Sequence, residues 1–146
     1  MATTRETSRL EVFDTTLHKT HAWINDLREE LGAENDHQAY AALRAVLHAL
    51  RDRLTIDETA HLAAQMPMLV RGMFYEGWKP ALVPVKSRNR EEFLNQVQAH
   101  FRGPPFLNPE QITRGVLALL DRYITRGEIN DVKSMMPSDV SDLWPE

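Results

Sequence analysis

The chain matches itself when it is shifted by 70 residues, and this internal match constrains the fold more than any other feature. Ten positions between residues 21 and 74 are identical to the residue 70 places later, without a gap. The clearest blocks are Leu43–Leu50 over Thr113–Leu120 and Met66-Pro67 over Met136-Pro137. A match of this length predicts a tandem duplication, so each half should contain the same elements in the same order.

The pattern within each copy is helical. In the first copy, apolar residues recur every three or four positions over residues 14–31 and again from Tyr40 to Leu54, and Gly32 provides a stop between them. Further helices are expected after Thr55 and after Pro67. The second copy repeats the plan, and no segment has the alternation of a strand. The sequence predicts an all-α bundle of about eight helices built from two tandem repeats offset by 70 residues.

Three short motifs mark helix starts. Asn108-Pro109-Glu110-Gln111 combines a capping residue with a proline at the first helical position. Thr55-x-x-Glu58 and Thr125-x-x-Glu128 both read as capping boxes. In each of these two boxes the glutamate should reach back to the backbone amide of the threonine.

The match also divides the chain. Residues 1–12 are polar without a helical stripe and are expected to be frayed. Residues 13–146 should form one all-α domain, since either half alone would bury a modest core. Within it we distinguish repeat one (14–74), the inter-repeat segment (75–90) and repeat two (91–146).

Composition narrows the classes of function. The chain has 17 Lys and Arg against 21 Asp and Glu, a net charge of −4, which argues against nucleic-acid and membrane partners. It has no cysteine, which excludes disulfides, thiol nucleophiles and thiolate zinc sites. No apolar run is long enough to span a bilayer, and no signal-peptide core opens the chain, so a cytoplasmic location is expected.

The inter-repeat segment has no counterpart after repeat two, and it does not resemble a flexible linker. It contains two prolines, yet it is rich in aromatic and branched apolar residues, and a run of cations follows its tryptophan. Such side chains concentrate binding energy at protein interfaces. We predict a docking surface for a protein partner, or for a second copy of the chain, formed by Tyr75, Trp78, Lys79, Lys86 and Arg88. The alternative is that Phe74 and Trp78 join the two halves.

Three strings in and around this segment are more specific than the helical pattern: Arg71–Trp78 followed by Pro80, Pro84-x-Lys86-x-Arg88, and Glu91–Leu94. With the flanking helical motifs, they resemble the bacterial family called domain of unknown function 2267, over roughly residues 14–146. The resemblance implies an all-α duplicated fold in a soluble bacterial protein. It implies no activity, because the family has no agreed catalytic residues.

Catalytic and metal-binding patterns are weak. No nucleophile motif and no phosphate-binding loop occurs, so we expect no catalytic residues and lean away from an enzyme. A metal site in a helical bundle would need Glu-x-x-His pairs on two helices. Glu58-x-x-His61 occurs once, and Asp131 stands in the place of His61 in repeat two. The sequence therefore predicts no metal and no cofactor.

Arg44 and Arg114 are the matched cations in otherwise apolar helices. A guanidinium that clamps backbone carbonyls or a carboxylate would explain both, and so would a twin anion site. Hence two functions stay open. The first is a non-catalytic interaction module that docks through the inter-repeat segment. The alternative is a protein or enzyme with a pocket between the repeats that binds a metal or a small anionic ligand, lined by Arg44, Arg114, His48 and Tyr40.

Overall fold

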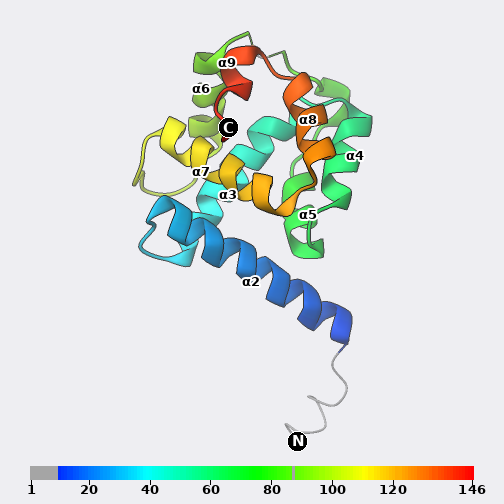
Figure 1. Cartoon of the computed structure of the whole chain (residues 1–146), viewed down its shortest axis with the longest axis vertical. Helices are drawn as coiled ribbons and strands as arrows, with labels where there is room; N and C mark the ends of the chain where they lie inside the picture. Colours follow the sequence, from blue (N-terminus) through cyan, green and yellow to red (C-terminus); the bar gives the residue numbers. More distant parts are fainter. Residues whose placement is uncertain (1–9, 87) are drawn as a thin grey trace, which may run out of the picture.

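The computed structural model describes residues 10–86 and 88–146. These residues form eight α-helices and one 3-10 turn, with no strand among them, so the predicted all-α bundle is confirmed. Figure 1 shows their arrangement. The elements are α2 (Glu11–Leu31), α3 (Asp36–Arg51), α4 (Ile56–Ala64), α5 (Met68–Tyr75), η1 (Pro80–Leu82), α6 (Arg90–His100), α7 (Pro109–Tyr123), α8 (Arg126–Ser134) and α9 (Ser138–Ser141).

Helix α3 is the centre of the core. Every residue from Ala42 to Arg51 is buried, because α2, α5, α6 and α7 all pack around this helix. Phe74 and Trp144, which are 70 residues apart in the sequence, are both buried in the core. A helix buried on all sides must be apolar all round or satisfy its polar groups internally. The two arginines and one histidine in this stretch, Arg44, Arg51 and His48, therefore need partners inside the protein.

Helices α4 and α8 lie side by side and run antiparallel (Figure 1). At one end, the Gln65 side-chain amide donates to the Thr125 hydroxyl oxygen at 3.1 Å and accepts from the Thr125 amide at 2.9 Å. At the other end, Thr55 and Met135 line the same pocket. The helices start 70 residues apart, as the internal match predicts. The duplication itself stays a prediction.

Local signals locate most helix ends. Helix α2 begins at Glu11, three residues before the predicted start, and ends where Gly32 adopts the left-handed conformation at φ 64°. Residues 1–9 of the segment expected to be frayed lie outside the described residues.

No helix in the described part of the chain is long and apolar enough to cross a bilayer.

Of the three predicted helix-start motifs, the one at the start of α7 forms a complete capping box, with both reciprocal hydrogen bonds. The Asn108 side chain accepts from the Gln111 amide at 2.8 Å, and the Gln111 side chain accepts from the Asn108 amide at 3.1 Å. We expect Asn108→Ala to lower the free energy of unfolding by about 1 kcal/mol, because the Gln111 amide loses its acceptor. Urea denaturation would measure this. Asn95→Ala, at an exposed position inside α6, is the control, and an equal loss there would contradict the capping explanation.

Candidate functional site

Tyr75 and Trp78 lie at the end of α5, where the inter-repeat segment leaves the bundle. Their rings are 5.4 Å apart, and the Phe74 ring is 5.7 Å from that of Tyr75. Phe74 is fully buried, whereas Tyr75 and Trp78 are half-buried. The indole Nε1 of Trp78 is covered and has no hydrogen-bond partner. The aromatic pair is therefore partly anchored on the bundle and partly open to solvent.

Most of the other described residues of the inter-repeat segment are exposed, and backbone hydrogen bonds hold the segment in place. The Val85 amide donates to the Asp52 carbonyl oxygen at 2.7 Å, and the Leu82 amide donates to the Lys79 carbonyl oxygen at 2.9 Å. Leu82 keeps 66% of its surface exposed and Val85 keeps 43%. The backbone is thus preorganised, while its apolar side chains face solvent.

A shallow pocket of about 450 Å³ adjoins this segment and combines apolar and basic groups. Val85 and Met135 are both exposed apolar residues on its wall, and Lys86 stands beside Val85. The side chains of Lys79, Lys86 and Arg88 are exposed and make no ion pair with the described residues. The predicted docking residues therefore share one segment, although the structure gives no contact between the aromatic pair and Lys86 or Arg88.

Arg44 is a structural clamp in this structure. Its side chain is buried, and it donates to the His100 carbonyl oxygen at 3.0 Å at the end of α6. Its Nε also lies 3.7 Å from the Glu76 carboxylate. Arg114 is different, since it is exposed on α7 and pairs with Glu110 at 3.0 Å. The two matched arginines thus bind different partners, and anion binding by them stays a prediction.

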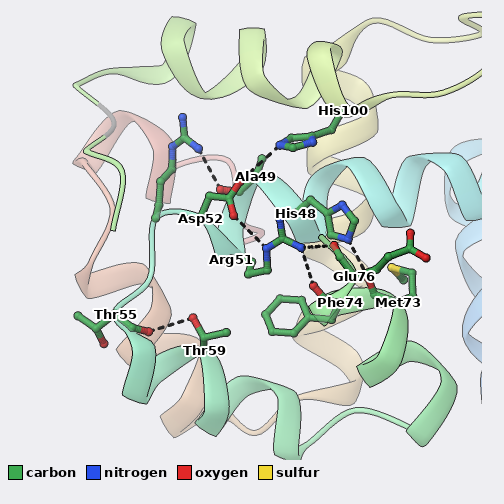
Figure 2. A network of polar contacts seen from close by, with 11 residues as sticks. His48, Ala49, Arg51, Asp52, Thr55, Thr59, Met73, Phe74, Glu76 and His100 are labelled. Carbon is green, nitrogen blue, oxygen red and sulfur yellow. Dashed lines mark hydrogen bonds and ion pairs between the residues drawn. The ribbon is translucent and has the colours of Figure 1, made fainter. Parts of the chain in front are cut away.

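His48 and Arg51 extend the same polar network, as Figure 2 shows. The Arg51 guanidinium donates to the Phe74 and Glu76 carbonyl oxygens at 2.9 and 2.7 Å, and pairs with Asp52 at 2.9 Å. His48 donates to the Met73 carbonyl oxygen at 2.7 Å. Burial lowers the pKa of His48 to about 4, so this imidazole is neutral near pH 7. Side chains of α3 therefore bind the carbonyl oxygens at the end of α5, as a helix cap would. His48 and Arg51 are both engaged in these bonds and are not available to a ligand.

A second cluster of ionisable groups occupies the seam between α4 and α8. Glu58 and Glu128 are 6% and 8% exposed, and oxygens of Glu58, Glu128 and Asp131 lie within 4.8 Å of one another. The His61 Nδ1 is 3.7 Å from the Glu58 Oε2. The two glutamates are thus directed at each other across the seam.

This arrangement corrects the capping-box expectation for α4 and α8. Thr55 and Thr125 do cap their helices, accepting from the Glu58 and Glu128 amides. The expected return bond from each glutamate does not form, because both carboxyl groups face the seam. The Thr-x-x-Glu spacing alone predicts a local role for Glu58 at the start of its own helix. One feature of the sequence is consistent with an inward orientation. Glu58 and Glu128 occupy matched positions, and each lies four residues before an apolar residue that is buried, Leu62 or Val132.

The carboxyl pair has an unusual protonation equilibrium. Burial raises the pKa of Glu128 to about 8, and the neighbouring Glu58 and Asp131 act in the same direction. Two buried carboxylates so close together repel each other unless a cation lies between them. With a pKa of about 8, Glu128 is mostly protonated near pH 7, which removes this repulsion in the protein alone. The protonation of this carboxyl pair therefore changes with pH near neutrality.

The fold and site define a helical bundle without a recognisable catalytic constellation in its described residues, with an exposed basic segment and a buried carboxyl pair. Residues 20–143 match the family model described as "Uncharacterized conserved protein (DUF2267)", and the chain belongs to this family. No curated protein matches the chain. The family has no established function, so function has to be argued from the chain's own geometry.

Proposed function

We propose that this protein is a non-catalytic interaction module that works in the cytoplasm and docks a partner protein through the inter-repeat segment. The observation that carries the proposal is the set of exposed cations Lys79, Lys86 and Arg88, which lack ion pairs with the described residues. Most of the other described arginines bind a carboxylate or a backbone carbonyl, and the remaining described cations without ion pairs, Lys19, Arg102 and Lys133, lie apart from one another in the sequence. Unpaired cations on a preorganised backbone are available to a partner at low conformational cost.

The chemistry of the segment favours one class of partner. Leu82 and Val85 present apolar surface next to the cations, and the pocket beside Val85 can accept a small apolar side chain. A complementary chain would carry acidic residues around one or two apolar anchors. We therefore propose an acidic segment of another protein, with aromatic contacts to the open parts of Tyr75 and Trp78.

The test is binding of fluorescent peptides in which acidic residues flank a leucine or phenylalanine, measured by anisotropy. We expect saturable binding that weakens at high salt, because part of the attraction is between exposed charges. Lys86→Glu combined with Arg88→Glu should weaken it by about tenfold or more, since two attractions become repulsions.

The matched control is Lys19→Glu combined with Arg102→Glu, which makes the same change in net charge at exposed positions elsewhere. If both double variants weakened binding equally, the effect would come from the change in net charge, and this result would contradict a defined docking surface. Light scattering on the same samples would detect self-association. A dimer disrupted by Lys86→Glu with Arg88→Glu alone would identify a second copy as the partner instead.

A further inference from the structure

Three carboxyl groups, those of Glu58, Glu128 and Asp131, meet in the α4–α8 seam, and the His61 imidazole lies beside Glu58. Glu58 and His61 are three residues apart on α4, and Glu128 and Asp131 are three apart on α8, so each pair lies on one helix face. The helices are antiparallel and in contact, which brings the two faces together. The oxygens of the three carboxyl groups lie within 4.8 Å of one another, close to the span of about 4–4.4 Å between opposite ligands of an ion bound at about 2.0–2.2 Å.

The four side chains differ in accessibility in a way that suits a site with an entrance. Glu58 and Glu128 form the buried floor, whereas Asp131 is exposed and the His61 side chain keeps 66% of its surface. The His61 Nδ1, at 3.7 Å from the Glu58 carboxylate, is too far for a hydrogen bond. An ion could enter from solvent past His61 and Asp131 and be held against the glutamates.

A separate observation concerns unmet hydrogen-bonding capacity. Glu58 Oε1 and Glu128 Oε2 are buried atoms without any hydrogen-bond partner, on side chains that are more than nine-tenths buried. A buried carboxylate oxygen without a donor or a cation is strongly unfavourable. Acids scattered on a helical surface would be solvated and would not carry this cost. The buried oxygens therefore point to a positively charged guest.

We propose that Glu58, Glu128, Asp131 and His61 bind one divalent transition-metal ion of the Mn²⁺–Zn²⁺ group in the seam between α4 and α8. Three carboxylates and one imidazole suit such ions, whereas Ca²⁺ and Mg²⁺ prefer oxygen ligands throughout. The sequence alone predicts no metal, because it shows one Glu-x-x-His pair. The structure pairs it with Glu-x-x-Asp from the neighbouring helix.

The test is titration of Mn²⁺ into chelator-treated protein, with free Mn²⁺ followed by electron paramagnetic resonance. We expect one ion per chain. Glu58→Gln and Glu128→Gln should each weaken binding by about 100-fold or more, since changes in groups that merely orient ligands already cost 10- to 100-fold. His61→Ala should weaken Mn²⁺ and Zn²⁺ binding more than Ca²⁺ binding, because it removes the nitrogen ligand.

The control is Asp57→Asn, which removes the same charge from an exposed neighbour of Glu58 in the first turn of α4. It should leave the affinity unchanged. The glutamine variants keep the side-chain shape and remove a repulsion, so they should fold, which circular dichroism would verify. Absence of saturable Mn²⁺ and Zn²⁺ binding would overturn the proposal. Equal weakening by Asp57→Asn, or wild-type affinity in Glu58→Gln, would also overturn it.

Discussion

Arg51→Ala is expected to lower the free energy of unfolding by about 3–5 kcal/mol, one of the two largest effects we foresee. The substitution removes a buried cation and leaves the Phe74 and Glu76 carbonyl oxygens without their donor. It also leaves the Asp52 carboxylate without its 2.9 Å partner. For a chain of this size, the melting temperature should fall by about 10–15 °C. Chemical and thermal denaturation would both measure the loss.

Arg114→Ala is the matched control for this prediction. Arg114 is exposed and pairs with Glu110 four residues away on the same helix, a contact worth about 0.3–0.5 kcal/mol. Arg51→Lys keeps the charge but cannot reproduce the forked contact with two carbonyls, so it should be intermediate. A loss below about 1 kcal/mol for Arg51→Ala would mean that the end of α5 is held by packing alone.

The second large effect is a loss of stability as the pH rises. The pKa of Glu128 is about 8 in the folded protein against an ordinary 4.5, so the folded state holds a proton that the unfolded state has released. That contribution is fully present below pH 4.5 and is lost as the pH rises to 8. We expect a decline of about 1–3 kcal/mol between pH 6.5 and pH 9 in the presence of a chelator.

His48 acts in the opposite direction but over a different range. Its pKa is lowered from 6.5 to about 4, so its contribution to stability grows between pH 4 and pH 6.5 and is complete above that. Measurements above pH 6.5 therefore isolate the carboxyl pair. Glu128→Gln should abolish the decline, and Asp57→Asn should preserve it. A decline of equal size in Glu128→Gln would assign the effect to another group. Added Mn²⁺ should reduce the decline if the seam binds it.

Helix starts were predictable from the sequence because a cap is decided within four residues. Thr55, Asn108 and Thr125 all cap the helices that they were expected to cap. Helix ends were less predictable. Helix α6 ends at His100, whose carbonyl oxygen accepts from the side chain of Arg44, 56 residues earlier. Such a contact depends on tertiary packing and leaves no local pattern.

The carboxyl pair between α4 and α8 was also not predictable from local sequence patterns. The capping-box pattern accounts for Thr55 and Thr125, but it cannot tell whether the following glutamate turns back to the helix or inward. Inward orientation follows from the contact between α4 and α8, which the sequence does not state. The inter-repeat segment was easier to find, because prolines, aromatic residues and cations in one short stretch are visible without a structure.

The bonds that cross between the two halves bear on how such a chain can be divided. Gln65 completes the first turn of α8, Arg44 holds the end of α6, and Tyr123 donates to Asp26 on α2. Each half thus lacks groups that the other provides. We therefore expect that neither half folds as an autonomous unit when it is expressed alone or moved to another protein, however alike the two stretches of sequence are.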